Sequence, residues 1–359
     1  MLKKEELIMD NKIKNICNRF GIKENYKSHD ILTSGHINTT YKVDFEDKSY
    51  ILQCINTYVF KNPEEVMENI FNVTSHIKNK LIKENKDYNR YVLNYKTSNN
   101  NPYIYDEDNN FWRCYDYIDN SITFNKTYDL KVIEESGKAF GEFQLHLKDF
   151  PVNNLNIVIP HFHNTVNRYE IFKEAIKNNL SNRKHLVEDL IKQYLDLEEI
   201  ATRMYKLQKE GKLPLKVTHN DTKCNNVLFD EDTHSHLAVI DLDTVMPGLV
   251  GFDFGDAIRF IANTSDEDEK DLSKVNLDLD KYNAFYNGFV SMLKNTLSPL
   301  ELETLPLGAI TMTIECGMRF LTDYLDGDKY FKVDYPDHNL VRSKCQLKLG
   351  KDMIGNFFN

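Results

Sequence analysis

The six cysteines of this 359-residue chain form no C-x-x-C pair and follow no regular spacing. In a chain of this length, such cysteines are typical of reduced, mostly buried thiols rather than of a disulfide framework. The first ten residues, MLKKEELIMD, contain no apolar signal segment, and no stretch reaches the roughly 18 apolar residues that span a bilayer. We therefore expect a soluble cytoplasmic protein without a membrane partner.

Basic residues are not in excess either. Lysine and arginine total 45 against 55 aspartates and glutamates, and the formal charge is −10. Because no basic face dominates, the sequence argues against a nucleic-acid partner. Internal repeats and low-complexity tracts are absent, and a hydrophobic share of 41% is ordinary for a globular protein. The chain exceeds the usual size of a single hydrophobic core, so two lobes are expected.

The most informative polar pattern lies in residues 216–260. It predicts two short strands joined by an acidic turn, with Asp221 and Asn226 before the first strand and Asp241 directly after the second. Two strands paired in this way bring their flanking side chains to one edge. Phosphoryl transfer needs a carboxylate that orients the acceptor hydroxyl and oxygen ligands for magnesium. We therefore assign Asp221 as the catalytic base and Asn226 and Asp241 as ligands of Mg²⁺.

This run resembles the phosphotransferases of the aminoglycoside and choline kinase superfamily, which are relatives of protein kinases. HNDTKCNN matches their His-x-Asp-(x)4-Asn catalytic loop, and Ile240-Asp241 matches the segment that holds the metal-binding aspartate. The continuation LDTVMPGLVGFDFGDAIR is similar to the N-acetylhexosamine 1-kinases. The same likeness extends to the segments at 34–43, 50–70, 159–168 and 318–333.

The resemblance implies an α+β, two-lobed protein-kinase-like fold. Residues 1–117 would form a small nucleotide-binding lobe with an antiparallel sheet, and residues 118–359 a larger, mainly helical catalytic lobe. It further implies ATP-dependent phosphorylation of the anomeric (C1) hydroxyl of N-acetylglucosamine or N-acetylgalactosamine, with ATP and Mg²⁺ as cofactors. The expected partners are therefore the sugar and ATP. The sequence does not decide between the two sugars or indicate an oligomeric state.

Apolar periodicity divides the small lobe into helices and strands. The expected elements are a helix at 5–20, a hairpin within 27–55, a helix beginning at Pro63, and strands at 91–95 and 110–117.

Nucleotide contacts are expected at two places in this lobe. The hairpin turn SGHINTT takes the position of a phosphate-covering loop, although an ordinary turn is the alternative on spacing alone. The segment CYDYIDNS is expected to be the hinge between the lobes, where backbone groups would contact an adenine edge. The predicted nucleotide-binding residues are Gly35, Asn38, Thr40, Gln53, Asp116 and Tyr117.

The chain departs from the family pattern on one strand. Relatives carry a lysine or arginine there that touches the phosphates, whereas residues 50–55 contain Gln53 and Cys54 and no basic residue. Either Gln53 contacts phosphate without a charge, or a cation comes from elsewhere in the chain. Glu65 and Glu68 on the next helix, which could pair with such a cation, are expected to face solvent instead.

Two further roles concern the catalytic loop itself. His219 is expected to bond backbone and brace the loop rather than to act as a base. Asp253 and Asp256 are expected to order the loop and to cap the helix that follows.

Helical periodicity dominates the second lobe, with helices expected at 130–147, at 183–208, near 282–293 and from Leu307. On the last of these, Glu315 and Arg319 have the spacing of an i,i+4 surface pair. The likeness to hexosamine kinases favours another role, in which Arg319 points into the acceptor pocket.

The remaining sugar contacts follow from the same likeness. Tyr330 would close the acceptor pocket, and Asp221, Asp243 and His163 would also contact the sugar. His163 belongs to one of two H-x-H pairs, at 161–163 and 234–236, which raise a zinc site as an alternative. We favour the sugar contact, because such scattered pairs seldom form zinc sites.

Two other functions compete with the hexosamine kinase. The first is a related small-molecule kinase for an aminoglycoside or for choline, which would need a strongly acidic pocket or an aromatic cage respectively. The second is a catalytically weak nucleotide-binding regulator, suggested by the missing strand cation. The intact set of Asp221, Asn226 and Asp241 argues against the regulator.

Overall fold

The computed structural model describes residues 2–33 and 37–358. Gly35, predicted in the phosphate-covering turn, lies outside the described residues. The small lobe is built on a five-stranded antiparallel sheet with the order β1-β2-β3-β5-β4. Its strands are β1 (Tyr26–Leu32), β2 (Thr39–Phe45), β3 (Ser49–Ile55), β4 (Ile104–Tyr105) and β5 (Phe111–Asp116).

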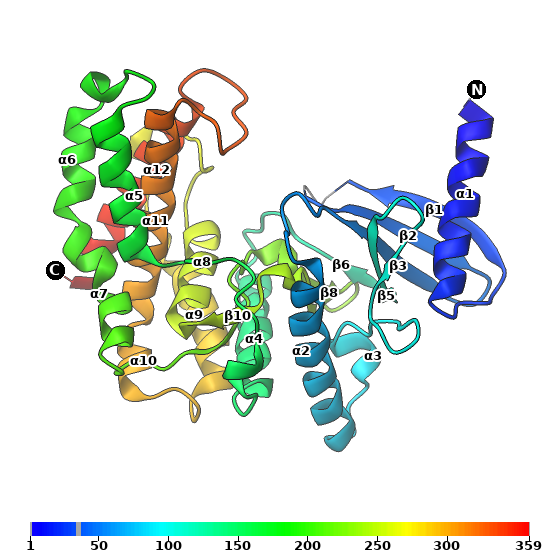
Figure 1. The fold of residues 1–359 in the computed structure, drawn as a ribbon. Coiled ribbons are helices and arrows are strands. Elements are labelled where there is room, and N and C mark those ends of the chain that lie inside the picture. The colour runs from blue at the N-terminus through cyan, green and yellow to red at the C-terminus, as the bar shows by residue number, and fades with distance from the viewer. Residues whose placement is uncertain (1, 34–36, 359) are drawn as a thin grey trace.

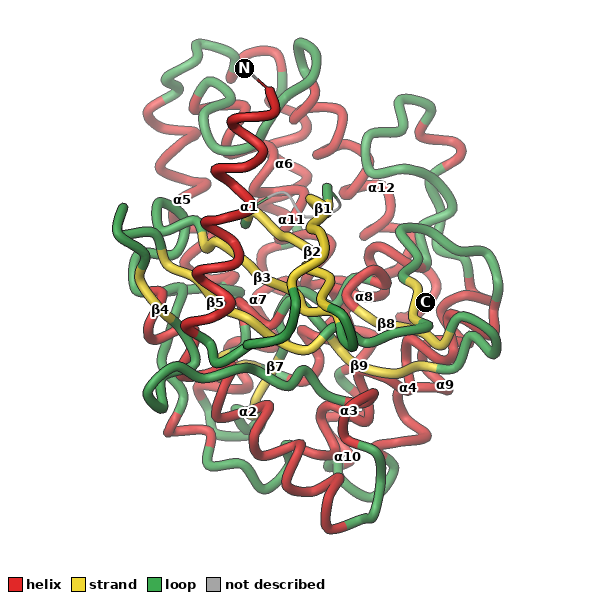
Figure 2. The backbone as a smooth tube through the Cα atoms, turned by 90° about the vertical axis from the view of Figure 1, so that its right-hand side faces the viewer, coloured by secondary structure: helices red, strands yellow, loops and turns green. Residues whose placement is uncertain are grey.

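Alternation along β2 decides which face of this sheet is covered. Tyr41, Val43 and Phe45 are buried, while the residues between them are partly exposed. These side chains pack in one cluster with apolar residues of helix α1 (Leu2–Arg19). Figures 1 and 2 show α1 lying across the outer face of the sheet, away from the helical lobe.

Helix α2 (Pro63–Lys83) packs on the side of the sheet that faces the helical lobe (Figure 1). Proline stands in its first turn, acidic residues follow there, and lysines occupy the last turn, all of which favour a helix with this direction. Its buried face belongs to the second core cluster and includes Val66, Met67, Ile70 and Val73.

The strand predicted at 91–95 is wrong. Residues Tyr88–Tyr91 form the short helix α3, which begins after Asp87 because that side chain accepts a hydrogen bond from the Asn89 N–H. In the rest of the segment, Tyr95 makes a single bridge to Tyr115. Apolar residues there fill the core without forming a strand.

The larger lobe is mainly helical and lies on the left in Figure 1. Its helices are α4 (Leu130–His146), α5 (Thr165–Asn178), α6 (Glu188–Asp196), α7 (Glu198–Lys209), α8 (Val250–Ile261), α9 (Leu279–Leu293), α10 (Pro299–Glu303), α11 (Leu305–Asp326) and α12 (His338–Phe358). The single helix predicted at 183–208 is therefore wrong, because the helix is interrupted at Leu197, between α6 and α7. Both α6 and α7 carry acidic residues in their own first turns, which stabilise two helix starts instead of one.

The structure also contains two small sheets, of three and two strands. One contains β6 (Ser121–Ile122), β8 (Val227–Asp230) and β9 (His236–Val239), and the other pairs β7 (Lys216–Thr218) with β10 (Met246–Gly248). The two strands predicted within 216–260 thus correspond to β8 and β9, which pair antiparallel. The proposed lobe boundary near residue 117 stays a prediction.

Helices α8 and α11 approach each other backbone to backbone. A Cβ atom on Gly308 would lie 2.0 Å from the Gly251 carbonyl oxygen, and one on Gly255 would lie 2.3 Å from the Gly308 carbonyl oxygen. No side chain fits at either position without moving the backbone. This close contact fixes the position of α8, the helix that carries Asp253 and Asp256.

Strand β9 is attached to α4 through a buried charged group. His236 lies between two glutamates of α4, with Nδ1 2.7 Å from Glu135 Oε2 and Nε2 3.2 Å from Glu142 Oε2. Burial alone would lower the pKa of His236, but the two carboxylates raise that pKa from 6.5 to about 9. The histidine is therefore protonated at neutral pH.

This histidine should make stability depend on alkaline pH. A pKa raised by folding contributes stability that is complete below pH 6.5 and is lost as the pH rises through about 9. We expect the free energy of unfolding of the wild type to fall by about 2–3 kcal/mol over this interval. A His236→Gln variant should lack that fall. Denaturant unfolding at pH 6.5 and at pH values above about 9 measures this free energy for both proteins. If His236 were neutral in the fold, the free energy of unfolding would change with pH by the same amount in the wild type and the variant.

Among the described residues, no helix combines the length and the apolarity needed to cross a membrane.

Candidate active site

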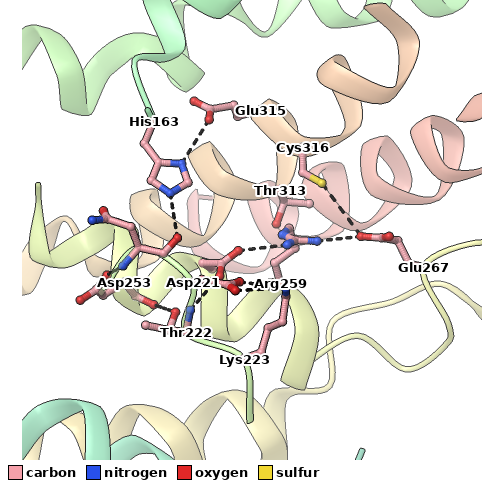
Figure 3. A network of polar contacts seen from close by, with 12 residues as sticks. His163, Asp221, Thr222, Lys223, Asp253, Arg259, Glu267, Thr313, Glu315 and Cys316 are labelled. Carbon is pink, nitrogen blue, oxygen red and sulfur yellow. Dashed lines mark hydrogen bonds and ion pairs between the residues drawn. The ribbon is translucent and has the colours of Figure 1, made fainter. Parts of the chain in front are cut away.

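The catalytic loop follows β7 and is held by hydrogen bonds to side chains of α8. The backbone N–H groups of His219 and Asn220 donate to the two oxygens of Asp253 at 2.9 and 2.8 Å, and the Thr222 N–H donates to Asp256 at 3.0 Å. Figure 3 labels Thr222 and Asp253 of this network. The prediction that Asp253 and Asp256 order the loop is confirmed.

Their predicted role as helix caps is wrong. Helix α8 begins at Val250, so Asp253 and Asp256 lie inside it, and the residue before it, Leu249, makes no side-chain cap. Both carboxylates are buried. Burial raises the pKa of Asp253, whereas Arg259 and Lys223 outweigh the same effect at Asp256 and lower its pKa.

His219 braces the loop, as predicted. Its Nδ1 accepts from the Asp221 N–H at 3.2 Å, and its Nε2 lies 2.8 Å from the Ile240 carbonyl oxygen, to which it donates. The ring is fully buried. Since both nitrogens are engaged with backbone, the imidazole has no free position from which to accept a proton.

The loop and β9 bring the three predicted catalytic residues to one place. Asn226 donates from Nδ2 to the backbone carbonyl oxygen of Asp221 at 2.8 Å. The backbone carbonyl oxygen of Asn226 accepts from the Ile240 N–H at 2.9 Å. Asp241 comes next in the chain and adopts a left-handed conformation with φ of 58°. The carboxylates of Asp221 and Asp243 lie close enough to influence its titration.

Charge is concentrated around Asp241. Burial raises the pKa of Asp241 to about 6, and the neighbouring carboxylates of Asp243 and Asp221 add to the rise. A cation bound here would relieve that repulsion. The oxygens of Asn226 and Asp241 are hard donors of the kind that Mg²⁺ prefers, so the residues present fit this metal.

Lys223 is a site residue that the sequence analysis missed. Its Nζ lies 2.9 Å from Asp221 Oδ1. Burial alone would lower the pKa of Lys223, but Asp221 and Asp256 raise it, so the lysine stays charged. Its position two residues after the catalytic aspartate was the available signal.

Asp243 joins the catalytic segment to the small lobe. Its two oxygens accept from Arg113 on β5 and from Asn38 Nδ2, the latter at 2.8 Å. Each oxygen of Asp243 therefore already has one donor, and the carboxylate keeps further lone pairs for a sugar hydroxyl. Arg113 also donates from Nε to Gln53 Oε1 at 2.8 Å, and Gln53 in turn donates to Thr40 Oγ1 at 3.0 Å.

The predicted hinge residues are held by their own lobe. The carboxylate of Asp116 is buried and lies 2.9 Å from Lys48 and 2.8 Å from Lys96. The N–H of Asp116 donates to the Asn94 carbonyl, and the N–H of Tyr117 to the Ser49 carbonyl. Adenine contacts from Asp116 and Tyr117 would have to use their carbonyl oxygens.

Glu315 is not the surface residue that an i,i+4 pair would need. Its side chain is 1% exposed and accepts from Thr165 Oγ1 at 2.5 Å, with His163 Nδ1 3.2 Å away. Burial alone would raise the pKa of Glu315, but these two partners lower it to about 2. The surface-pair alternative is therefore wrong, because α11 is covered on this side by the segment before α5.

His163 connects that buried carboxylate to the catalytic loop. Its Nε2 lies 3.2 Å from the Asn220 carbonyl oxygen (Figure 3). His161 and His163 both have left-handed φ angles, so this segment is not an extended strand. The zinc alternative loses its ligands, because His163 is bonded to Glu315 and His236 to two glutamates. Within the described residues, no group of three or more His, Cys, Asp or Glu side chains could hold a metal.

Arg319 and Tyr330 lie together on the rim of the helical lobe. The Arg319 guanidinium carbon is 5.8 Å from the centre of the Tyr330 ring and 5.4 Å from that of Phe331. Tyr330 is 74% exposed. Asp323 anchors this loop by accepting from three successive N–H groups, those of residues 329–331.

A cavity of about 310 Å³ lies next to Lys223. It is lined by polar residues including Lys223, Arg259 and Gln346, and the four predicted sugar contacts outside the loop do not line it. Arg259 is held by Asp256 at 3.0 Å and by Glu267 at 2.8 Å.

The sheet lobe, the helical lobe and the loop between them define the class of this protein as a protein-kinase-like phosphotransferase. The chain belongs to the phosphotransferase enzyme family, whose model matches residues 30–278. It is accordingly a phosphotransferase. The predicted α+β, two-lobed fold is confirmed.

Solved structures share this fold at low sequence identity. The microcompartment-associated aminopropanol kinase has a TM-score of 0.62 at 14% identity, covering 97% of this chain and 98% of that one. An aminoglycoside phosphotransferase from Alicyclobacillus acidocaldarius has a TM-score of 0.61 at 9% identity, covering 96% and 93%. The ADP-bound aminoglycoside phosphotransferase APH(2'')-Ib has a TM-score of 0.50 at 13% identity, covering 96% and 99%. At such identities the likeness concerns the fold and does not identify the acceptor.

Proposed function

We propose that this enzyme transfers the terminal phosphoryl group of ATP to the anomeric hydroxyl of N-acetylglucosamine or N-acetylgalactosamine. The observation that carries the chemistry is the convergence of Asp221, Asn226 and Asp241 at the end of the β8–β9 hairpin. The choice of acceptor is supported by the likeness of LDTVMPGLVGFDFGDAIR to the hexosamine 1-kinases. A relative with the same fold binds ADP, which supports ATP as the donor.

Each residue has a task in this reaction. Asp221 accepts the hydrogen bond of the C1 hydroxyl and takes its proton as the bond to phosphorus forms. Lys223, 2.9 Å from the same carboxylate, balances negative charge at that position. Asn226 and Asp241 would hold Mg²⁺, which when bound neutralises charge on the phosphate oxygens.

We place the sugar against the rim formed by Arg319 and Tyr330, with His163 and Asp243 nearer the loop. The His163 ring, 3.2 Å from the Asn220 carbonyl, connects this side of the helical lobe with the catalytic loop. A cytoplasmic location fits the six cysteines, all of which are free thiols in the structure.

The direct test is a panel of acceptors incubated with ATP and magnesium. It should contain both N-acetylhexosamines, their non-acetylated parents, choline, ethanolamine and an aminoglycoside. We expect phosphate on C1 of an N-acetylhexosamine, located by NMR through its coupling to phosphorus. Transfer to choline or an aminoglycoside alone would refute the sugar assignment but keep the kinase. If the protein consumed no ATP with any of these acceptors, the result would favour the regulator.

Arg319 provides a test of where the acceptor binds. An Arg319→Ala variant should raise the KM for the sugar about tenfold or more and leave the KM for ATP unchanged, because a charge-assisted hydrogen bond to a hydroxyl is lost. The matched control is Gln346→Ala in the 310 Å³ cavity beside Lys223. If only the Gln346 variant raised the sugar KM, the acceptor would occupy that cavity instead.

A further inference from the structure

The small lobe must supply positive charge to a nucleotide, yet β3 has none. Gln53 stands on β3 where relatives are expected to carry a lysine or arginine. Its direct partner on the neighbouring strand β5 is Arg113. The two side chains are joined, since Arg113 Nε donates to Gln53 Oε1 at 2.8 Å. The cation missing from β3 is therefore present one strand away at the same level of the sheet.

Arg113 is placed at the boundary between the sheet and the metal-binding segment. Its side chain is 2% exposed and forms an ion pair with Asp243, two residues after Asp241. Its Nη1 also lies 3.8 Å from the Met67 sulfur on α2. Strand β3, helix α2 and the segment that carries Asp243 thus all contact this one guanidinium.

The guanidinium has a donor to spare. Nε bonds Gln53 and Nη1 bonds Asp243, while Nη2 donates to no acceptor among residues 2–33 and 37–358. A guanidinium presents its donors as a planar fork that suits phosphate oxygens. Burial makes such a charge costly unless further anionic groups surround it.

Charges on the two sides of the site are otherwise matched. Lys223 is paired with Asp221 on the helical lobe, and Arg113 with Asp243 on the sheet side. Asp241, which would hold the magnesium of a bound nucleotide, lies two residues before Asp243, the partner of Arg113. Lys48 and Lys96, which lie beside the sheet, are already paired with Asp116, and Lys42 on β2 lies 3.4 Å from Asp44.

We propose that Arg113 binds the phosphates of the nucleotide and takes the place of the missing cation on β3. This inference rests on the proposed use of ATP. Gln53 then acts as a positioning residue, because it holds Nε and directs the other donors of the fork. Asp243 holds the guanidinium in place through its ion pair.

The experiment compares ligands that differ in their phosphates. Calorimetry would measure the Kd of ADP and of adenosine for the wild type and for Arg113→Met, Arg113→Lys and the double variant Gln53→Lys/Arg113→Met. We expect Arg113→Met to weaken ADP binding about ten- to a hundredfold while adenosine changes little. Arg113→Lys should retain most of the ADP affinity. The double variant should regain it, because its new lysine on β3 lies directly opposite position 113.

Metal-free measurements separate a direct phosphate contact from an effect transmitted through Asp243 to the metal site. In EDTA, the loss of ADP affinity in Arg113→Met should persist. A loss seen only with magnesium, or an equal loss for ADP and adenosine, would overturn the proposal. Arg19→Met on α1 serves as the matched arginine control. Should Arg113→Met fail to fold, the double variant Arg113→Met/Asp243→Asn, which leaves no unpaired buried carboxylate, decides by the same ADP-to-adenosine ratio. A wild type that binds ADP no better than adenosine would instead refute the proposed function.

Discussion

Replacement of Asp221 by asparagine is expected to lower kcat by about two to four orders of magnitude, because the carboxylate that we propose as the base is lost. The Kd for nucleotide should stay nearly unchanged, since Asn226 and Asp241 remain. The shape of the loop should also persist, because it depends on the backbone bonds to Asp253. Single-turnover kinetics and nucleotide titration on the same protein would check both statements.

Asp232→Asn, an exposed residue in the β8–β9 turn, is the matched control and should leave kcat unchanged. The outcome that contradicts the assignment is near-normal turnover in the Asp221 variant.

The Asp253→Ala variant should show the largest effect on folding. The Asp253 carboxylate accepts from His219 N–H, from Asn220 N–H and from Gln144 Nε2 at 2.9, 2.8 and 2.7 Å, and it is 1% exposed. Removing it leaves three buried donors without a partner, which costs about 3–5 kcal/mol of unfolding free energy. Denaturant unfolding measures this loss directly.

Activity should fall with stability in this variant, because the catalytic loop loses the group that holds it. We expect a decrease of kcat of at least about tenfold at a temperature where the protein is still folded. Asp196→Ala at the exposed end of α6 should change stability by less than about 0.5 kcal/mol. Equal denaturation midpoints for Asp253→Ala and the wild type would mean that α8 does not support the loop.

Local patterns were sufficient for much of the fold. The alternation in β2, the proline and acidic start of α2, and the apolar stripe of α11 each depend on neighbours in the chain, and the structure confirms all three. Two predicted elements were wrong because a local signal favoured another structure. Asp87 caps a turn of helix where a strand was predicted, and Leu197 separates two helices whose apolar residues share one periodicity.

What the sequence alone determined is the catalytic loop: the order and spacing of Asp221, Asn226 and Asp241, and the bracing role of His219. These follow from short-range geometry, because one hairpin brings them together. The tertiary structure decided the charge partners. Arg113 meets Asp243 across 130 residues and Glu315 meets His163 across 152, and such pairs arise from the packing of separate lobes and helices, which leaves no periodic signal along the chain.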